Sequence, residues 1–259
     1  MRLGKIFGVL AAALIAVACT SGSPETVNVL VGGEFVTVSL VNSSLTLDRP
    51  TGVVADGADM ATVTLLVRDT ANNPVPGLAV GLQVSGSGNI VRGPAATTDA
   101  NGMAVATIAS TVAETKTLTG SVNGQPVEQT ATVTFVAGPP ARLNFAVQPT
   151  AATTTSVIVP AVQVSVEDAH GNRNLDASVP VTLNLASNPG SASLLGTTSV
   201  TTVSGLARFE DLLVDLPGNG YTLRASSPGL SDATSQPFDI STGSGGGTTG
   251  GTSGGGTPG

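Results

Sequence analysis

Apolar and polar residues alternate along short segments through most of the chain after residue 44. Val63, Leu65 and Val67, for example, alternate with Thr62 and Thr64. A period of two places successive side chains on opposite faces of a strand, and short strands spaced about ten residues apart are typical of a β-sandwich. The pattern therefore predicts an all-β protein. Expected core positions in the first half are Val80, Leu82, Val84, Met103, Val105, Leu118, Val122, Val133 and Phe135.

Turn-forming residues separate these segments. Asn-Asn-Pro stands at 72–74, Asp-Ala-Asn-Gly at 99–102 and Asn-Gly at 123–124. Glycine adopts positive φ, and Asn and Asp side chains bond their own backbone, so each run predicts a turn. Gly-Pro-Pro at 138–140 then ends the series, because proline cannot donate to a strand ladder. We expect a stiff boundary there between two units.

The second half repeats the first about 100 residues later. Residues 68–73 correspond to 167–172, and Gly102 corresponds to Gly205, in the same order and with similar spacing. Two units of one fold are therefore predicted. Expected core residues of the second unit are Val162, Val164, Val166, Val181, Leu183 and Leu185, with Phe145, Phe209, Tyr221 and Phe238 as the large ones.

The first residues form the three parts of a secretory signal peptide. Arg2 and Lys5 supply a positive region, and an apolar and glycine run follows from Ile6 to Val17. Small residues and Cys19 come next, as at a cleavage site. The run is shorter than the roughly 20 apolar residues of a membrane-spanning helix. The chain is therefore expected to be exported.

The Ala-Val-Ala-Cys sequence at 16–19 resembles the lipobox of bacterial lipoproteins, although that family prefers leucine where Ala16 stands. The resemblance implies a leader cut before Cys19 and acyl chains on its thiol. Cys19 is also the only cysteine, so an intrachain disulfide is excluded. Several acyl chains give stable membrane anchoring. Thr20 is not the retaining Asp of enteric lipoproteins, so the outer membrane is expected in a Gram-negative cell.

Composition narrows the function classes. Charged residues make up 10% and aromatic residues 3% of the chain, and no tryptophan is present. Without Arg2 and Lys5, eight basic residues stand against seventeen acidic ones, a net charge of −9. Nucleic-acid binding needs a basic footprint, so we expect none. Sugar sites usually contain aromatic platforms, which disfavours a glycoside hydrolase or a carbohydrate-binding module.

No catalytic or cofactor-binding group is predicted. Nucleophilic catalysis needs a nucleophile and a base within reach, yet the only histidine, His170, stands in a predicted turn. The only lysine beyond the leader, Lys116, is expected to be a solvated strand residue rather than part of an isopeptide link. Tyr221 is interpreted as a core residue whose hydroxyl bonds nearby backbone, as in many immunoglobulin folds.

Calcium can be bound by oxygen ligands alone. The candidate ligands do not have the spacing of an EF-hand or a nonapeptide repeat. We therefore expect turn and strand-end roles for these carboxylates, and no metal. The candidate calcium ligands are Asp56, Asp59, Asp69 and Asp99.

The first unit resembles the bacterial immunoglobulin-like (Ig-like) domain of the invasin and intimin group. The residues that carry the resemblance are Ala-Asp-Gly-Ala-Asp at 55–59, Asn-Pro-Val-Pro-Gly at 73–77, Thr-Asp-Ala-Asn-Gly at 98–102 and Thr-Val-Thr-Phe at 132–135. The second unit is similar but lacks the Ala-Asp-Gly opening. The resemblance implies a spacer or adhesive role outside the cell.

Together these patterns predict two tandem immunoglobulin-like β-sandwiches after a lipoprotein signal peptide, with a disordered Gly/Thr/Ser tail. The expected protein is a non-catalytic, membrane-anchored surface lipoprotein that acts as a stalk and as an adhesion module for an extracellular protein or cell-surface ligand. The alternative is an accessory region of a larger exported enzyme or carbohydrate-binding protein, joined through the tail. The predicted N-terminal parts are a signal peptide at 1–18 and, at 19–41, lipidated Cys19 with a tether in which a strand is left open. The predicted parts that follow are domain 1 at 42–137, a linker at 138–141, domain 2 at 142–241 and the tail at 242–259.

Overall fold

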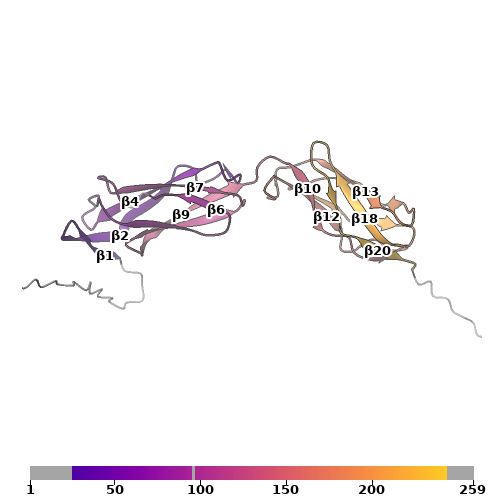
Figure 1. Cartoon of the computed structure of the whole chain (residues 1–259), viewed down its shortest axis with the longest axis horizontal. Coiled ribbons are helices and arrows are strands. Elements are labelled where there is room, and N and C mark those ends of the chain that lie inside the picture. Colours follow the sequence, from indigo (N-terminus) through magenta and orange to yellow (C-terminus); the bar gives the residue numbers. More distant parts are fainter. Residues whose placement is uncertain (1–24, 95–96, 244–259) are drawn as a thin grey trace, which may run out of the picture.

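The computed structural model describes residues 25–94 and 97–243. They form two β-sandwiches that lie end to end and are joined by the segment between β9 and β10 (Figure 1). In the described part of the chain, no helix is long and apolar enough to cross a membrane. The all-β architecture predicted from the alternating pattern is confirmed.

The first sandwich consists of a five-stranded sheet, in the order β1-β2-β4-β7-β6, and a four-stranded sheet, in the order β3-β9-β8-β5. Neighbouring strands are antiparallel except for β3, which pairs with β9 in parallel. The strands are β1 (Thr26–Val31), β2 (Glu34–Leu47), β3 (Val53–Val54), β4 (Ala61–Asp69), β5 (Val80–Val84), β6 (Asn89–Arg92), β7 (Met103–Ser110), β8 (Thr115–Val122) and β9 (Gln125–Val136).

The core of this sandwich lies between its two sheets. Val63, Leu65 and Val67 of β4 are at most 3% exposed, while the residues between them are half-buried. Leu118, Val133 and Phe135 face them from the second sheet as predicted. Burying an aliphatic or aromatic side chain of this kind contributes roughly 1.5–3 kcal/mol, so the alternation sets which face of each strand points inward.

The predicted inward face of β7 is wrong. Met103 is half-buried and Val105 is exposed, whereas Ala104, Ala106 and Ile108 point into the core. The strand pairs with β4 so that Val63 lies opposite Ala106. Directly opposed residues share a face of the sheet. The small Ala side chains therefore take the inner positions beside the large β4 residues. Assigning the inner face to the larger residues Met103 and Val105 chose the wrong set of alternate positions.

The segment predicted to be a tether belongs to the first sandwich. β1 and the first part of β2 form a hairpin, and Val29, Val38 and Leu40 lie in the core cluster. The boundary expected at residue 42 falls inside β2. A β-bulge between Ser39 and Ser44 interrupts the pairing of β2 with β4 there, so the period-two pattern breaks although the strand continues.

Side chains stabilise this bulge. The Ser43 hydroxyl donates to the carbonyl of Ser39 at 2.6 Å and accepts from the N–H of Arg68 at 3.1 Å. Ser43 is 1% exposed, and a buried backbone donor without a partner would be costly. The hydroxyl thus replaces a backbone acceptor at the point where the ladder is interrupted.

The second sandwich contains the sheets β10-β12-β16 and β11-β20-β18-β13-β15, a two-stranded sheet of β14 and β17, and β19, which pairs with β18. Its core contains the four predicted aromatic residues, each at most 5% exposed. The strands are β10 (Arg142–Val147), β11 (Ala152–Thr153), β12 (Val162–Glu167), β13 (Pro180–Ser187), β14 (Leu194–Leu195), β15 (Ser199–Thr201), β16 (Leu206–Phe209), β17 (Leu213–Val214), β18 (Gly218–Ser226), β19 (Ala233–Thr234) and β20 (Phe238–Ser241).

Tyr221 is a core residue whose hydroxyl bonds nearby backbone, as predicted. Its ring is fully buried beside Phe238, with ring centroids 6.0 Å apart. Its hydroxyl donates to the carbonyl of Leu216 at 2.9 Å. The polar end of a buried tyrosine needs such a partner, so this backbone contact makes the burial favourable.

Candidate functional site at the domain junction

The residues singled out from the sequence do not come together as a chemical site. Cys19, with its leader, lies outside the described residues. His170 is exposed in the turn after β12. Each candidate calcium ligand instead accepts hydrogen bonds from its own neighbourhood. Asp56 accepts from the N–H groups of Ala58 and Asp59, and Asp99 from those of Asn101 and Met103.

The other two candidate ligands have partners of the same local kind. Asp59 binds the Arg49 guanidinium and the N–H of Val54, and Asp69 binds Asn73. Across the described ranges, no three His, Cys, Asp or Glu side chains gather where they could hold a metal ion. The turn interpretation of these aspartates agrees with the geometry.

The expectation of a solvated Lys116 is wrong. Its side chain is 0% exposed, and its ammonium donates to Glu114 Oε1 at 2.7 Å and to the carbonyl of Ser87 at 2.6 Å. The Nζ atom lies 5.9 Å from the centroid of the Phe135 ring. Strand parity explains the burial, because Lys116 shares the inner face of β8 with Leu118. The lysine thus secures the loop between β5 and β6.

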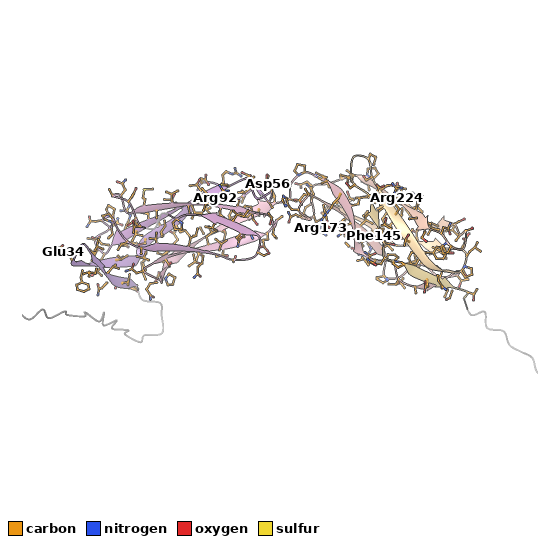
Figure 2. All side chains as sticks on the ribbon, in the orientation of Figure 1. Glu34, Asp56, Arg92, Phe145, Arg173 and Arg224 are labelled. Carbon is orange, nitrogen blue, oxygen red and sulfur yellow. The ribbon has the colours of Figure 1, made fainter. Side chains whose placement is uncertain are left out.

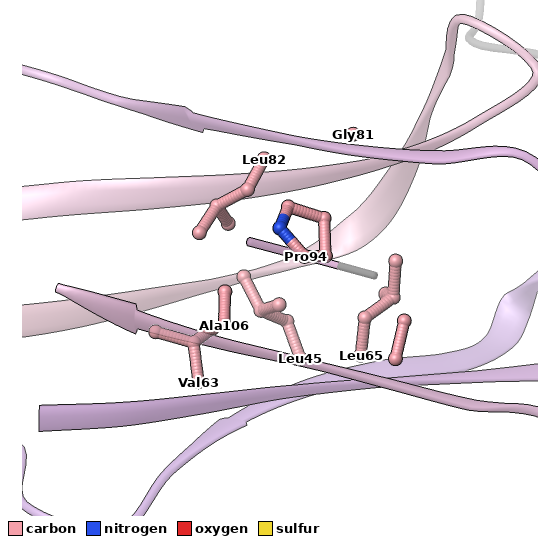
Figure 3. Close-up of a pocket in the computed structure, with 8 residues that line it drawn as sticks. Leu45, Val63, Leu65, Gly81, Leu82, Pro94 and Ala106 are labelled. Carbon is pink, nitrogen blue, oxygen red and sulfur yellow. The ribbon is translucent and has the colours of Figure 1, made fainter. Parts of the chain in front are cut away.

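Neither of two hollows among the described residues has the features of a ligand site. The first has about 10 Å³ of free volume and lies among Leu45, Leu65 and Leu82 in the first core, with Pro94 at its side (Figure 3). That volume holds about one water molecule. The second is an open hollow of about 370 Å³ that includes Thr197 and Asp211. Asp211 accepts from both the N–H and the hydroxyl of Thr197, so its carboxylate is already engaged.

A network of side-chain hydrogen bonds is found where the two sandwiches meet. Figure 2 shows Asp56 at the end of the first sandwich that faces the second, and Arg173 at the facing end of the second. The junction loop, residues 168–174, follows β12 and lies between them. Asp168 begins it and is 2% exposed. A buried carboxylate needs hydrogen bonds from all sides, and this one has four.

The Asp168 carboxylate shapes the loop and holds the linker. Its Oδ1 accepts from the N–H groups of His170 and Asn172, each at 2.9 Å. Its Oδ2 accepts from the Asn172 side chain at 2.9 Å and from the N–H of Gly138 at 2.8 Å. The Asn174 side chain donates to the carbonyl of Gly138 at 2.9 Å. Both backbone groups of Gly138 are therefore bound by the second sandwich.

Asn172 connects the two sandwiches directly. Its Oδ1 accepts from the N–H of Ala113 at 2.9 Å, and its Nδ2 donates to the carbonyl of Thr111 at 3.0 Å. Both partners lie in the turn between β7 and β8 of the first sandwich. The Ser110 hydroxyl braces that turn by accepting from the N–H of Val112 at 3.0 Å. One side-chain amide thus satisfies a donor and an acceptor of the neighbouring domain.

Electrostatics favour the charged form of Asp168 at neutral pH. Burial acts to raise the pKa of its carboxyl group, but the hydrogen bonds from Asn172, Gly138 and His170 outweigh burial and leave the pKa below its ordinary value. The ionised carboxylate accepts all four bonds. Protonation would replace an acceptor site with a donor, so the junction depends on the charge.

The first sandwich contains the same loop, and the second sandwich does not pack against it. Asp69 Oδ1 accepts from the N–H of Asn73 at 2.8 Å, and Oδ2 accepts from the Asn73 side chain at 3.0 Å. The asparagine side chain is exposed here. The repeat therefore supplies the internal bonds of the loop twice, and of the two asparagines it is Asn172 that bonds to the other described sandwich.

This arrangement binds domain to domain, and it defines a protein of Ig-like β-sandwich domains connected in series. Residues 42–136 match the family described as bacterial Ig-like domain (group 1). The match covers most of the first sandwich and agrees with the sequence resemblance. Among curated proteins, none matches the chain.

Solved structures similar to this chain include three bacterial proteins. The Yersinia pseudotuberculosis adhesin InvE is 20% identical over 78% of this chain and 60% of its own, with a TM-score of 0.40. InvD of the same organism is 22% identical over 78% and 58%, with a TM-score of 0.42. The Escherichia coli adhesin FdeC is 19% identical over 82% and 71%, with a TM-score of 0.43. The chain thus spans about 60% of the length of each of the two Yersinia proteins.

Proposed function

We propose that this protein is a non-catalytic, lipid-anchored surface protein in which two Ig-like sandwiches form a stiff stalk and an adhesion module. The observation that supports the stalk most strongly is the hydrogen bonding of Asn172 to the turn at Thr111 and Ala113. A freely jointed pair of domains would leave these groups to water. Interfaces within a chain otherwise permit domain motion, so a bonded junction favours a spacer.

The lipid anchor is supported by the signal-peptide pattern and by the position of Cys19 as the only cysteine. A thiol is required there because the lipid is attached as a thioether. Mass spectrometry of the mature N-terminus tests the anchor. We expect a chain that begins at Cys19 and carries acyl chains, located in the outer membrane if the cell is Gram-negative. An unmodified thiol in the mature chain would remove the anchor from the proposal.

The adhesion role needs its own test. Loops and strand edges are where binding residues usually lie on a rigid scaffold, and an extracellular protein or cell-surface ligand is the expected partner. The purified mature protein should adhere to at least one surface in a panel of cells and matrix proteins. If it adheres to none, the spacer role remains and the adhesion role is rejected.

The stalk is tested by its length in solution. Small-angle X-ray scattering of the purified protein should give a single, narrow distribution whose maximum dimension equals that of two sandwiches placed end to end (Figure 1). A broad distribution with many bent forms would contradict a stiff spacer.

A further inference from the structure

The hairpin of β1 and β2 exposes two large apolar side chains beside each other. Leu30 and Phe35 are register partners and are 60% and 80% exposed. Partners in an antiparallel pair carry Cβ atoms about 4.5–5.5 Å apart on one face. Phe35 is the most exposed large apolar residue in the described part of the chain. The pair therefore forms an apolar contact point, named here the hairpin tip.

The hairpin tip is close in sequence to Cys19 and lies at one end of the described part of the molecule. Glu34, next to Phe35, is at the end of the first sandwich farthest from the second (Figure 2). β1 begins at Thr26, seven residues after Cys19. A fully extended chain spans at most about 3.6 Å per residue, so Thr26 cannot lie more than about 25 Å from a lipid attached at Cys19. The anchor thus keeps the hairpin close to the membrane surface.

Charge defines how the hairpin tip can meet that surface. The only charged residues between 25 and 47 are Glu25 and Glu34, so attraction to anionic headgroups is absent. The contact must come from apolar burial, which contributes roughly 1.5–3 kcal/mol for each fully buried Leu or Phe. That is too little to hold a free protein on a membrane. A tether raises the effective concentration to about millimolar, where so weak a contact suffices.

We propose that Leu30 and Phe35 insert into the interfacial layer of the membrane that carries the Cys19 lipid. The inference rests on the lipid anchor proposed above and deepens it. A lipid alone is one point of attachment, about which the stalk could swivel. A second point at the hairpin tip fixes the direction in which the stalk leaves the surface.

The test uses tryptophan as a probe, because the chain has none. The Phe35→Trp variant is expressed with its leader and purified as the cell processes it. Acylated protein is reconstituted in vesicles of phosphatidylethanolamine and phosphatidylglycerol. Protein with a free thiol is coupled through Cys19 to a maleimide lipid in the same vesicles. We expect a blue-shifted emission that brominated acyl chains quench.

Val105→Trp is the matched control, because Val105 is 47% exposed on β7 and away from the hairpin tip. Its emission should be unchanged by vesicles and unquenched. In the Phe35→Trp background, Leu30→Ser should lower the quenched fraction at least about twofold, since half of the apolar contact is removed. Equal quenching of the Phe35→Trp and Val105→Trp proteins would overturn the proposal.

Two further outcomes separate the possible failures. If the purified protein has a free thiol and does not float with vesicles, the natural anchor fails, while the coupled protein still decides the hairpin contact. If Phe35→Trp emission shifts with protein concentration in the absence of vesicles, the hairpin tip meets a second copy of the chain, and insertion into lipid is rejected.

Discussion

The Asn172 side chain of the second sandwich accepts a hydrogen bond from the main-chain N–H of Ala113 in the first, at 2.9 Å. Asn73 forms the same bonds within its own loop, and among the described residues it does not bond to the second sandwich. The repeat therefore provides a matched pair of positions. One asparagine is part of the junction, and the other reports only what its loop contributes to folding.

Asn172→Ala should make the stalk flexible. The change removes two hydrogen bonds between domains, each worth roughly 0.5–1.5 kcal/mol net. It also removes the hydrogen bond from the Asn172 side-chain amide to Asp168. The distance distribution from small-angle scattering should broaden and shift to shorter dimensions. Asn73→Ala should leave that distribution unchanged while costing a similar amount of loop stability. Identical scattering from the two variants would show that Asn172 does not hold the domains.

Acid should loosen the junction before it unfolds the sandwiches. The pKa of Asp168 is lowered in the folded protein, so its contribution is complete above the ordinary Asp value of about 3.9. It is lost as the pH falls through the lowered pKa. Scattering of the wild type should therefore be unchanged from neutral pH down to about 3.9 and should broaden as the pH is lowered further. Asp168→Asn should already be flexible at neutral pH, and Asp69→Asn, its matched control, should behave like the wild type.

Removing Glu114 should destabilise the first sandwich more than removing Lys116. Glu114→Ala leaves the fully buried ammonium of Lys116 with the Ser87 carbonyl as its one hydrogen-bond acceptor among the described residues, and a buried charge without its counter-ion costs about 3 kcal/mol or more. Lys116→Met keeps the volume, and the carboxylate of Glu114 is exposed enough for water to solvate it, so about 1 kcal/mol is expected. Urea unfolding followed by circular dichroism measures both. The reverse order would mean that the ammonium is hydrated.

Gly205→Ala should destabilise the second sandwich severely. Gly205 has a φ of 69°, and a Cβ there would lie 2.0 Å from the carbonyl oxygen of Asn174. Gly220 has a φ of 81° with nothing within 4 Å of an added Cβ, so Gly220→Ala should cost only the roughly 1–2 kcal/mol of backbone strain. Tyr221 is the only tyrosine and is buried in this sandwich, so its fluorescence follows the unfolding. Equal costs would contradict the close approach.

Strand parity accounts for most of what the sequence could predict, and also for what it missed. Alternation of large apolar residues located β4, β8 and β12 correctly. The same parity applied to Lys116 would have placed it in the core, because it stands two residues before Leu118. In β7 the large side chain of Val105 suggested the wrong inner face. The inner positions there are alanines, whose small volume fits opposite Val63 and Leu65.

The junction could not be predicted from the sequence, because the same loop sequence pattern occurs in both sandwiches and does not show which loop contacts another domain. Asp and Asn stand four residues apart in both loops and form the same internal bonds. Of the two loops, the second is the one that lies against another sandwich in the described part of the chain. The contacts of Asn172 with Thr111 and Ala113 join residues about 60 positions apart, and no local pattern encodes that proximity. The hairpin was missed because the bulge at Ser39 to Ser44 hides the continuity of β2.

The loop at Asp69 has a consequence for how such a protein can gain domains in evolution. Its geometry is complete without a neighbour, since its own carboxylate and amide define it. A duplicated gene segment that encodes one more sandwich upstream would need to offer a carbonyl and an N–H from one turn, and a linker residue bound as Gly138 is. Lengthening the molecule would then require an insertion in the gene, and the receiving loop already contains the Asp69–Asn73 pair.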